Sequence, residues 1–201
     1  MTHPKPAHHH GNLRAALIHA GIDLLEDGGP EALTLRKCAL RAGVSHAAPA
    51  HHFDGLAGLK EAIAGEAFHR FSASMLKAVA TGDPSPRGRL KSICRGYLQF
   101  GLDHPALLDL IFGVPAPVPQ DIDPDAKDET AYGVLRQTCA PFVPQGTPRE
   151  VIEAQVWSLI HGYTLLFISG RLNCRAPRAV EDGPFDAVMA LLDRVGVDPA
   201  P

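Results

Sequence analysis

The side chains best suited to bind another molecule lie between Thr34 and Lys60. Their hydroxyl, imidazole and cationic groups can hydrogen-bond to base edges or to phosphate oxygens, and an alanine methyl can contact thymine. Asp54 is the only acidic residue in this stretch. A solvated charged face is the alternative interpretation. The candidate DNA-binding residues are Thr34, Arg36, Lys37, Arg41, Ser45, His46, Ala47, Pro49, His51, His52 and Lys60.

The charge distribution along the chain agrees with such a surface. The formal net charge is −3, but residues 1–70 carry seven Lys/Arg and seven Asp/Glu, whereas residues 71–201 carry twelve and fifteen. Nine of the eleven histidines also precede residue 70. The acidity therefore belongs to the second part of the chain, and a locally basic patch remains available for phosphate contacts.

The spacing within this stretch predicts two short helices separated by a tight turn. Leu35, Ala39 and Leu40 recur at helical spacing, and Gly43 follows where the chain must leave right-handed geometry. Ser45 is a good N-cap for a second helix over residues 45–52. A two-helix unit with a glycine in the turn is typical of proteins that place a helix in the DNA major groove.

The rest of the chain predicts an all-α protein. No β-type alternation of any length is visible, and helical patterns recur between Gly- and Pro-rich breaks. We expect a three-helix DNA-binding domain over residues 1–54 and a ligand-binding and dimerisation domain, a helical bundle entered by a long linking helix, over residues 55–201. Residues 114–124 read as a proline-rich loop. Helices are expected at 12–27, 55–80, 87–103, 105–112, 125–139, 147–172 and 184–195.

Aromatic and apolar residues in the second part indicate a candidate effector cavity. Trp157 and His161 are four residues apart and so share a helix face. One interpretation is a buried Trp–His pair held by backbone carbonyls. The other is a cavity wall suited to a hydrophobic or amphipathic ligand with one polar group. The candidate lining residues are Phe100, Leu108, Phe112, Trp157, His161, Tyr163 and Phe167.

Several classes of function find no support in the sequence. We see no nucleophile elbow, P-loop, HExxH or Rossmann glycine pattern, so we expect no enzyme and no cofactor. The four cysteines lie far apart without a CxxC pair, and we expect reduced thiols. The run His8–His10 cannot easily converge on one metal ion, so no metal site is expected. A polar N-terminus and an interrupted apolar run over 156–168 predict a cytoplasmic protein without a membrane span.

The N-terminal segment HHHGNLRAALIHAGIDLLEDGGPEALTLRKCALRAGVSHAAPAHHF resembles the DNA-binding domain of the TetR-type transcriptional regulators. The second part is similar to the ligand-binding domain of one branch of that family, through Trp157 to Gly162 and Phe100 to Gly113. The resemblance implies a homodimer that binds a palindromic operator in double-stranded DNA and is released by a small-molecule effector. The surplus of apolar residues in the last two helices agrees with a dimer interface.

Two positions depart from the family pattern. Ala50 stands where members usually carry a tyrosine that contacts phosphate, and Leu56 stands where a lysine is common. Both changes remove phosphate anchors rather than base readers. The alternative function is therefore a small-molecule-binding protein of the same fold with weak or lost DNA binding.

Overall fold

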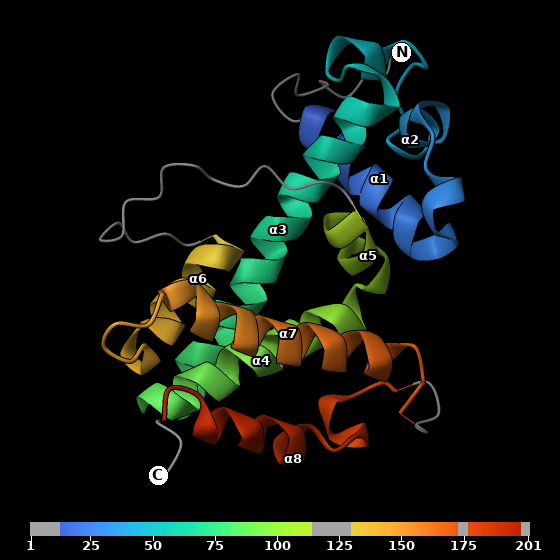
Figure 1. Cartoon of the computed structure of the whole chain (residues 1–201). Helices are drawn as coiled ribbons and strands as arrows, with labels where there is room; N and C mark the ends of the chain where they lie inside the picture. Colours follow the sequence, from blue (N-terminus) through green and yellow to red (C-terminus); the bar gives the residue numbers. More distant parts are fainter. Residues whose placement is uncertain (1–12, 114–129, 173–176, 198–201) are drawn as a thin grey trace, which may run out of the picture. The chain divides into compact units, whose positions relative to one another are not determined.

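The computed structural model describes residues 13–113, 130–172 and 177–197, and all regular secondary structure in these ranges is helical (Figure 1). This confirms the all-α fold class. The expected arm at His8–His10, the loop at 114–124, the first part of the helix expected at 125–139, and Cys174 lie outside the described residues. The chain divides into two compact units, residues 1–66 and 67–201, with the boundary inside a helix. The predicted domain division, after residue 54, precedes that helix.

The first unit is a small helical domain. It contains α1 (Leu13–Gly28), α2 (Leu35–Arg41), the 3₁₀ helix η2 (Ala48–His51) and the first half of α3 (Gly55–Thr81). A short 3₁₀ turn, Pro30–Ala32, connects α1 to α2. The core side chains, all at most 2% exposed, come from each of the α-helices and from the turn: Leu17, Ile22, Leu25, Leu33, Cys38, Ala39, Leu59 and Ile63.

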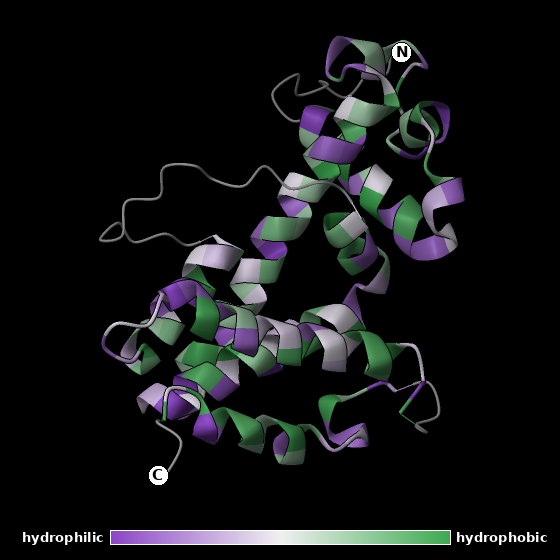
Figure 2. Ribbon diagram, viewed as in Figure 1, coloured by the Kyte–Doolittle hydropathy of each residue, from purple (hydrophilic) through white to green (hydrophobic). Residues whose placement is uncertain are grey.

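The second unit is a bundle around α4 (Pro86–Asp103), which packs against α5 (Pro105–Gly113), α6 (Ala131–Cys139) and α7 (Arg149–Ile168). The second half of α3, α8 (Phe185–Met189) and the 3₁₀ helix η5 (Ala190–Arg194) complete it. Figure 2 shows hydrophobic residues along α7 and α8. Buried side chains in this core include Leu90, Leu98, Leu107, Val156 and Phe167.

Within the second unit, α3 and α4 approach closely at Gly96. A Cβ atom at this position would lie 2.6 Å from the Cα of Met75 and 2.6 Å from the carbonyl oxygen of Ser74. Because both neighbours are backbone atoms, no side-chain rotation could make room. The Ser74 hydroxyl also donates a hydrogen bond to the Gly96 carbonyl (2.9 Å). A glycine is therefore required where the two helices cross.

The ends of the C-terminal helices differ from the sequence prediction. The helix expected over 147–172 begins after Pro148 and ends at Ile168, where Gly170 adopts a φ of 70°. The helix expected over 184–195 is a five-residue α-helix that continues as 3₁₀. Among the described helices, α7 alone is long and apolar enough to cross a membrane, but Val156, Ile160 and Phe167 on it are buried within the bundle.

Candidate nucleic-acid interface and effector region

The turn between α2 and η2 has the geometry that the sequence predicts. Gly43 adopts a φ of 69°, in the left-handed region that favours glycine. The Val44 N–H donates to the Ala39 carbonyl (3.0 Å), which closes the end of α2. At the other end, Thr34 caps the helix, because its side-chain oxygen accepts a hydrogen bond from the Lys37 N–H (3.2 Å).

The recognition segment, defined here as residues 45–52, differs from the expected helix. Only Ala48–His51 is regular, and it is a 3₁₀ helix. Pro49 explains this difference, since proline has no N–H to donate to the Ser45 carbonyl four residues earlier. The Ala48 N–H instead bonds the Ser45 carbonyl (3.0 Å), and the His52 N–H bonds the Pro49 carbonyl (3.0 Å). The Ser45 side chain is not the N-cap of this 3₁₀ helix, which begins from Ala47.

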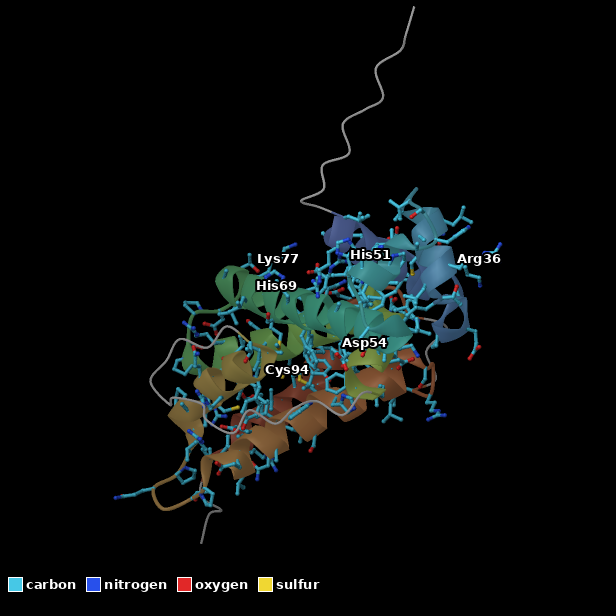
Figure 3. All side chains as sticks on the ribbon, turned by 90° about the horizontal axis from the view of Figure 1, so that it is seen from above. Arg36, His51, Asp54, His69, Lys77 and Cys94 are labelled. Carbon is cyan, nitrogen blue, oxygen red and sulfur yellow. The ribbon has the colours of Figure 1, made fainter. Side chains whose placement is uncertain are left out.

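Most of the candidate DNA-binding residues lie at the surface of the first unit. Arg36, Lys37, Ser45, His46, Ala47 and His51 are exposed, while Thr34, His52 and Lys60 are half-buried. Figure 3 shows Arg36 at the periphery of the molecule. Pro49 is buried, so it packs inside the unit and offers no surface for contact. Leu40, expected on the packed face of α2, is 72% exposed.

Arg41 differs from the other α2 cations because it forms an ion pair. Its Nη2 lies 2.7 Å from the Asp27 carboxylate at the end of α1. Arg36 and Lys37 make no ion pair within the described residues. We therefore expect Arg36 and Lys37 to contact phosphate more readily than Arg41. The Arg14 guanidinium, which lies 5.4 Å from the centre of the Phe53 ring, is a further cation that the sequence analysis did not single out.

In the second unit, an aromatic cluster surrounds His161. The Tyr97 hydroxyl and His161 Nδ1 are 2.6 Å apart, and the Phe112 ring lies 4.6 Å from the imidazole, centre to centre. Trp157 packs against Phe112 at 6.1 Å, and Phe71 packs edge-on against Tyr97 at 4.7 Å. The partner of His161 is thus a tyrosine on α4, not the backbone carbonyl that the sequence analysis considered.

Burial sets the protonation of this pair. It lowers the pKa of His161 below its usual range and raises the pKa of Tyr97, an effect that a hydrogen bond with Trp157 partly opposes. Both groups are therefore neutral near pH 7. An indole N–H can donate to the Tyr97 oxygen while the Tyr97 O–H donates to a neutral His161, so the three polar atoms satisfy one another.

The seven candidate effector residues do not form one wall. Phe112, Trp157 and His161 contact one another, and Phe100 joins them through Phe71 at 5.1 Å. Leu108 is fully buried. Tyr163 and Phe167 instead stack on each other at 5.5 Å, next to Phe185 of α8.

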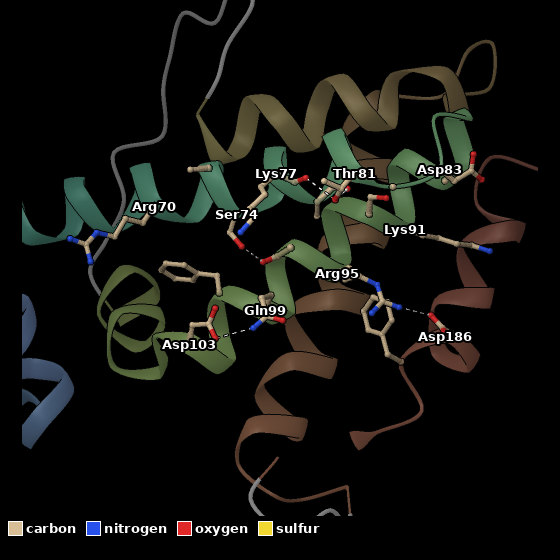
Figure 4. A pocket seen from close by; sticks show the side chains of 18 of the residues that line it. Arg70, Ser74, Lys77, Thr81, Asp83, Lys91, Arg95, Gln99, Asp103 and Asp186 are labelled. Atoms are coloured by element: carbon tan, nitrogen blue, oxygen red, sulfur yellow. Dashed lines mark hydrogen bonds and ion pairs between the residues drawn. The ribbon is translucent and has the colours of Figure 1, made fainter. Parts of the chain in front are cut away.

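A groove of about 750 Å³ lies elsewhere on the second unit, along α3, α4 and α8 (Figure 4). Its sides are mostly polar, and of the seven candidate effector residues only Phe100 lines it. Two of its cations are already paired: Arg95 with Asp186 at 3.1 Å, and Lys91 with Asp193 at 2.8 Å. Sequence reasoning did not anticipate this groove, because its two sides come from helices that meet only in the fold.

An all-helical protein with a small N-terminal domain containing a glycine turn, followed by a larger helical bundle, has the architecture of a DNA-binding regulator. Residues 90–192 match the model of the tetracyclin repressor-like C-terminal domain. The chain belongs to this TetR-like family, as its sequence resemblance indicates. No curated protein matches the chain significantly.

Solved structures share the fold. A protein of unknown function from Rhodococcus sp. RHA1 is 26% identical, with a TM-score of 0.70 over 96% of this chain and 97% of that one. A TetR family transcription regulator from Marinobacter aquaeolei is 16% identical, with a TM-score of 0.62 over 90% and 93%. A TetR-family regulator from Streptomyces coelicolor is 18% identical, with a TM-score of 0.58 over 97% and 100%.

Proposed function

We propose that this chain is a transcriptional repressor that binds a palindromic operator as a homodimer and is released by a small hydrophobic or amphipathic molecule. It would act in the cytoplasm, without a cofactor and without enzymatic activity. The observation that carries the proposal is the exposed recognition segment, held after α2 by the left-handed Gly43 turn.

The chemistry of the first unit supports DNA binding. Ser45, His46 and His51 offer exposed hydrogen-bonding side chains, and Arg36 and Lys37 offer exposed cations on the preceding helix. Hydrogen bonds to base edges would select a sequence, and the cations would fix the unit on the phosphate backbone. A two-fold dimer would place two such segments in successive major grooves, about 34–36 Å apart.

An exposed apolar face supports the homodimer. On α7, Val151, Leu165 and Leu166 are each about 40% exposed, and Leu191 on η5 is 55% exposed. Val151 and Leu166 were expected at the interface, whereas Val156 on the same helix is fully buried within its own bundle. Two helices from each subunit would remove the exposed side chains from water.

The effector is proposed to bind at the aromatic cluster. Phe71, Phe112 and Trp157 supply apolar surface, and the Tyr97–His161 pair supplies the single polar group. A hydrophobic or amphipathic molecule matches this combination. The predicted site residues Phe100, Leu108, Tyr163 and Phe167 would shape the surrounding walls.

Release from DNA would follow from a population shift. The helix α3 contributes residues to both units, and its Phe71 belongs to the aromatic cluster. An effector that prefers a different position of this helix would withdraw the dimer from spacings that fit the operator. The size of the effect equals the difference in effector affinity between the two states.

The departures at Ala50 and Leu56 favour the alternative, a small-molecule-binding protein with weak DNA binding. Ala50 is exposed but has no hydroxyl group to reach a phosphate. The first experiment is therefore selection of bound fragments from a random duplex library, followed by binding measurements on His46→Ala and His51→Ala. We expect recovered palindromes and weaker binding by both variants, with the dimer intact by light scattering. Binding curves that match the unmodified protein would reject the role of these histidines.

A further inference from the structure

The recognition segment is unusual in the type of charge that it carries. From Ala42 to Leu59 the ionisable side chains are His46, His51, His52 and Asp54, with no lysine or arginine. Imidazole is the side chain whose charge changes between pH 5 and 8. The segment and Asp54 together therefore carry −1 when the imidazoles are neutral and +2 when all three are charged, since three positive charges add to one negative charge.

The two outer imidazoles are positioned to titrate in solvent. His46 and His51 are exposed, and neither forms an ion pair or a hydrogen bond within the described residues. His52 is half-buried and lies beside Phe53, with ring centres 6.4 Å apart. Burial therefore does not oppose protonation of the outer pair.

The surrounding elements contribute fixed charges. On α2, Arg36 and Lys37 are exposed cations, and Arg41 is neutralised by Asp27 of α1. The other two facing charges are Arg14, which lies over the Phe53 ring, and Lys60 on α3. Asp54 is the only acidic group within the segment's own stretch, so few negative charges offset a protonated imidazole.

We infer that this chain binds DNA in a proton-dependent manner, with His46 and His51 acting as the titrating phosphate contacts of the recognition segment. The inference rests on the proposed DNA binding and concerns its regulation. Each imidazole that gains a proton becomes a cation beside a phosphate, and a charge-assisted hydrogen bond is stronger than a neutral one. The affinity for DNA therefore increases as the pH falls through about 6.5.

The size of the effect follows from counterion release. Each neutralised phosphate steepens the log–log dependence of affinity on salt by about 0.9, so two imidazoles add about 2 to the slope. At fixed ionic strength we expect affinity to rise about tenfold or more between roughly pH 8 and pH 5.5, since two charge-assisted contacts are gained.

The test is fluorescence anisotropy with a labelled random-sequence duplex, because phosphate contacts do not depend on sequence. Binding is measured at about pH 5.5, 6.5 and 8, a range that spans imidazole titration, each at several salt concentrations. The key variant is His46→Gln with His51→Gln, which keeps hydrogen-bonding capacity but cannot gain charge. The matched control is His69→Gln, an exposed histidine of the second unit (Figure 3). Circular dichroism at each pH verifies that the fold is retained.

We expect the native protein and His69→Gln to bind more tightly and with a steeper salt slope at low pH, and the double glutamine variant to lose both changes. A double arginine variant should bind at pH 8 as the native protein binds at pH 5.5. Binding that is independent of pH would overturn the inference and leave the proposed function standing. A pH response that persists in the double glutamine variant would also overturn it, and no binding at any pH would reject the proposed function itself.

Discussion

Replacing Gly96 with alanine tests the close crossing of α3 and α4. The added Cβ would lie 2.6 Å from Met75 Cα and from the Ser74 carbonyl oxygen, and 2.9 Å from the Met75 nitrogen. Overpacking of this kind costs about 1–3 kcal/mol. Separation of the helices would also lengthen the hydrogen bond from the Ser74 hydroxyl to the Gly96 carbonyl, a loss of about 1 kcal/mol. The higher helix propensity of alanine returns about 1 kcal/mol. We expect a net loss of about 1–3 kcal/mol in the free energy of unfolding.

Urea unfolding followed by far-ultraviolet circular dichroism measures this loss. Fluorescence of Trp157, the only tryptophan of the chain, reports separately on the second unit. The matched control is Gly65→Ala, also in the helix α3, where an added Cβ would meet no atom within 4 Å. That substitution should stabilise the protein by about 0.5–1 kcal/mol. If Gly96→Ala unfolds at the same urea concentration as the native protein, or at a higher one, the argument from the helix crossing is wrong.

Three further predictions concern buried polar groups. Tyr132→Phe removes the donor, 2.5 Å away, to a carboxylate oxygen of the buried Glu153 and should cost about 1–3 kcal/mol; an unchanged denaturation midpoint would contradict this. Because burial lowers the pKa of His161, the unfolded chain takes up the proton first, so stability present above about pH 6.5 should fall on acidification; His161→Gln should weaken that pH dependence. Burial raises the pKa of the described cysteine thiols, so mass spectrometry after alkylation at pH 8 should find them unmodified until urea unfolds the chain: Cys38, Cys94 and Cys139.

The helices of the first unit could be predicted from local signals. The apolar spacing and the Gly28–Gly29 break locate α1, and the turn at Gly43 follows from the conformational freedom of glycine. The 3₁₀ form of the recognition segment was also encoded locally, through Pro49, but the family resemblance favoured a full helix. Leu40 shows the limit of periodicity, since helical spacing does not say whether a neighbouring element covers that face.

The polar partners of the second unit could not be read from the sequence. Tyr97 and His161 are 64 residues apart, and their hydrogen bond depends on the packing of α4 against α7. The ion pair that occupies Arg41 depends in the same way on α1 and α2. Residue type and spacing therefore identified the binding surface better than they identified which of its charges are available.

The most direct test of the account is the salt dependence of binding to the DNA that flanks this chain's own gene. We predict a linear fall of log affinity with log salt concentration, and a slope reduced by about 1 in Arg36→Gln. Arg41→Gln should leave the slope close to that of the native protein, because Arg41 is paired with Asp27. A slope near zero, or no binding at low salt, would contradict the assignment of this chain as a DNA-binding regulator.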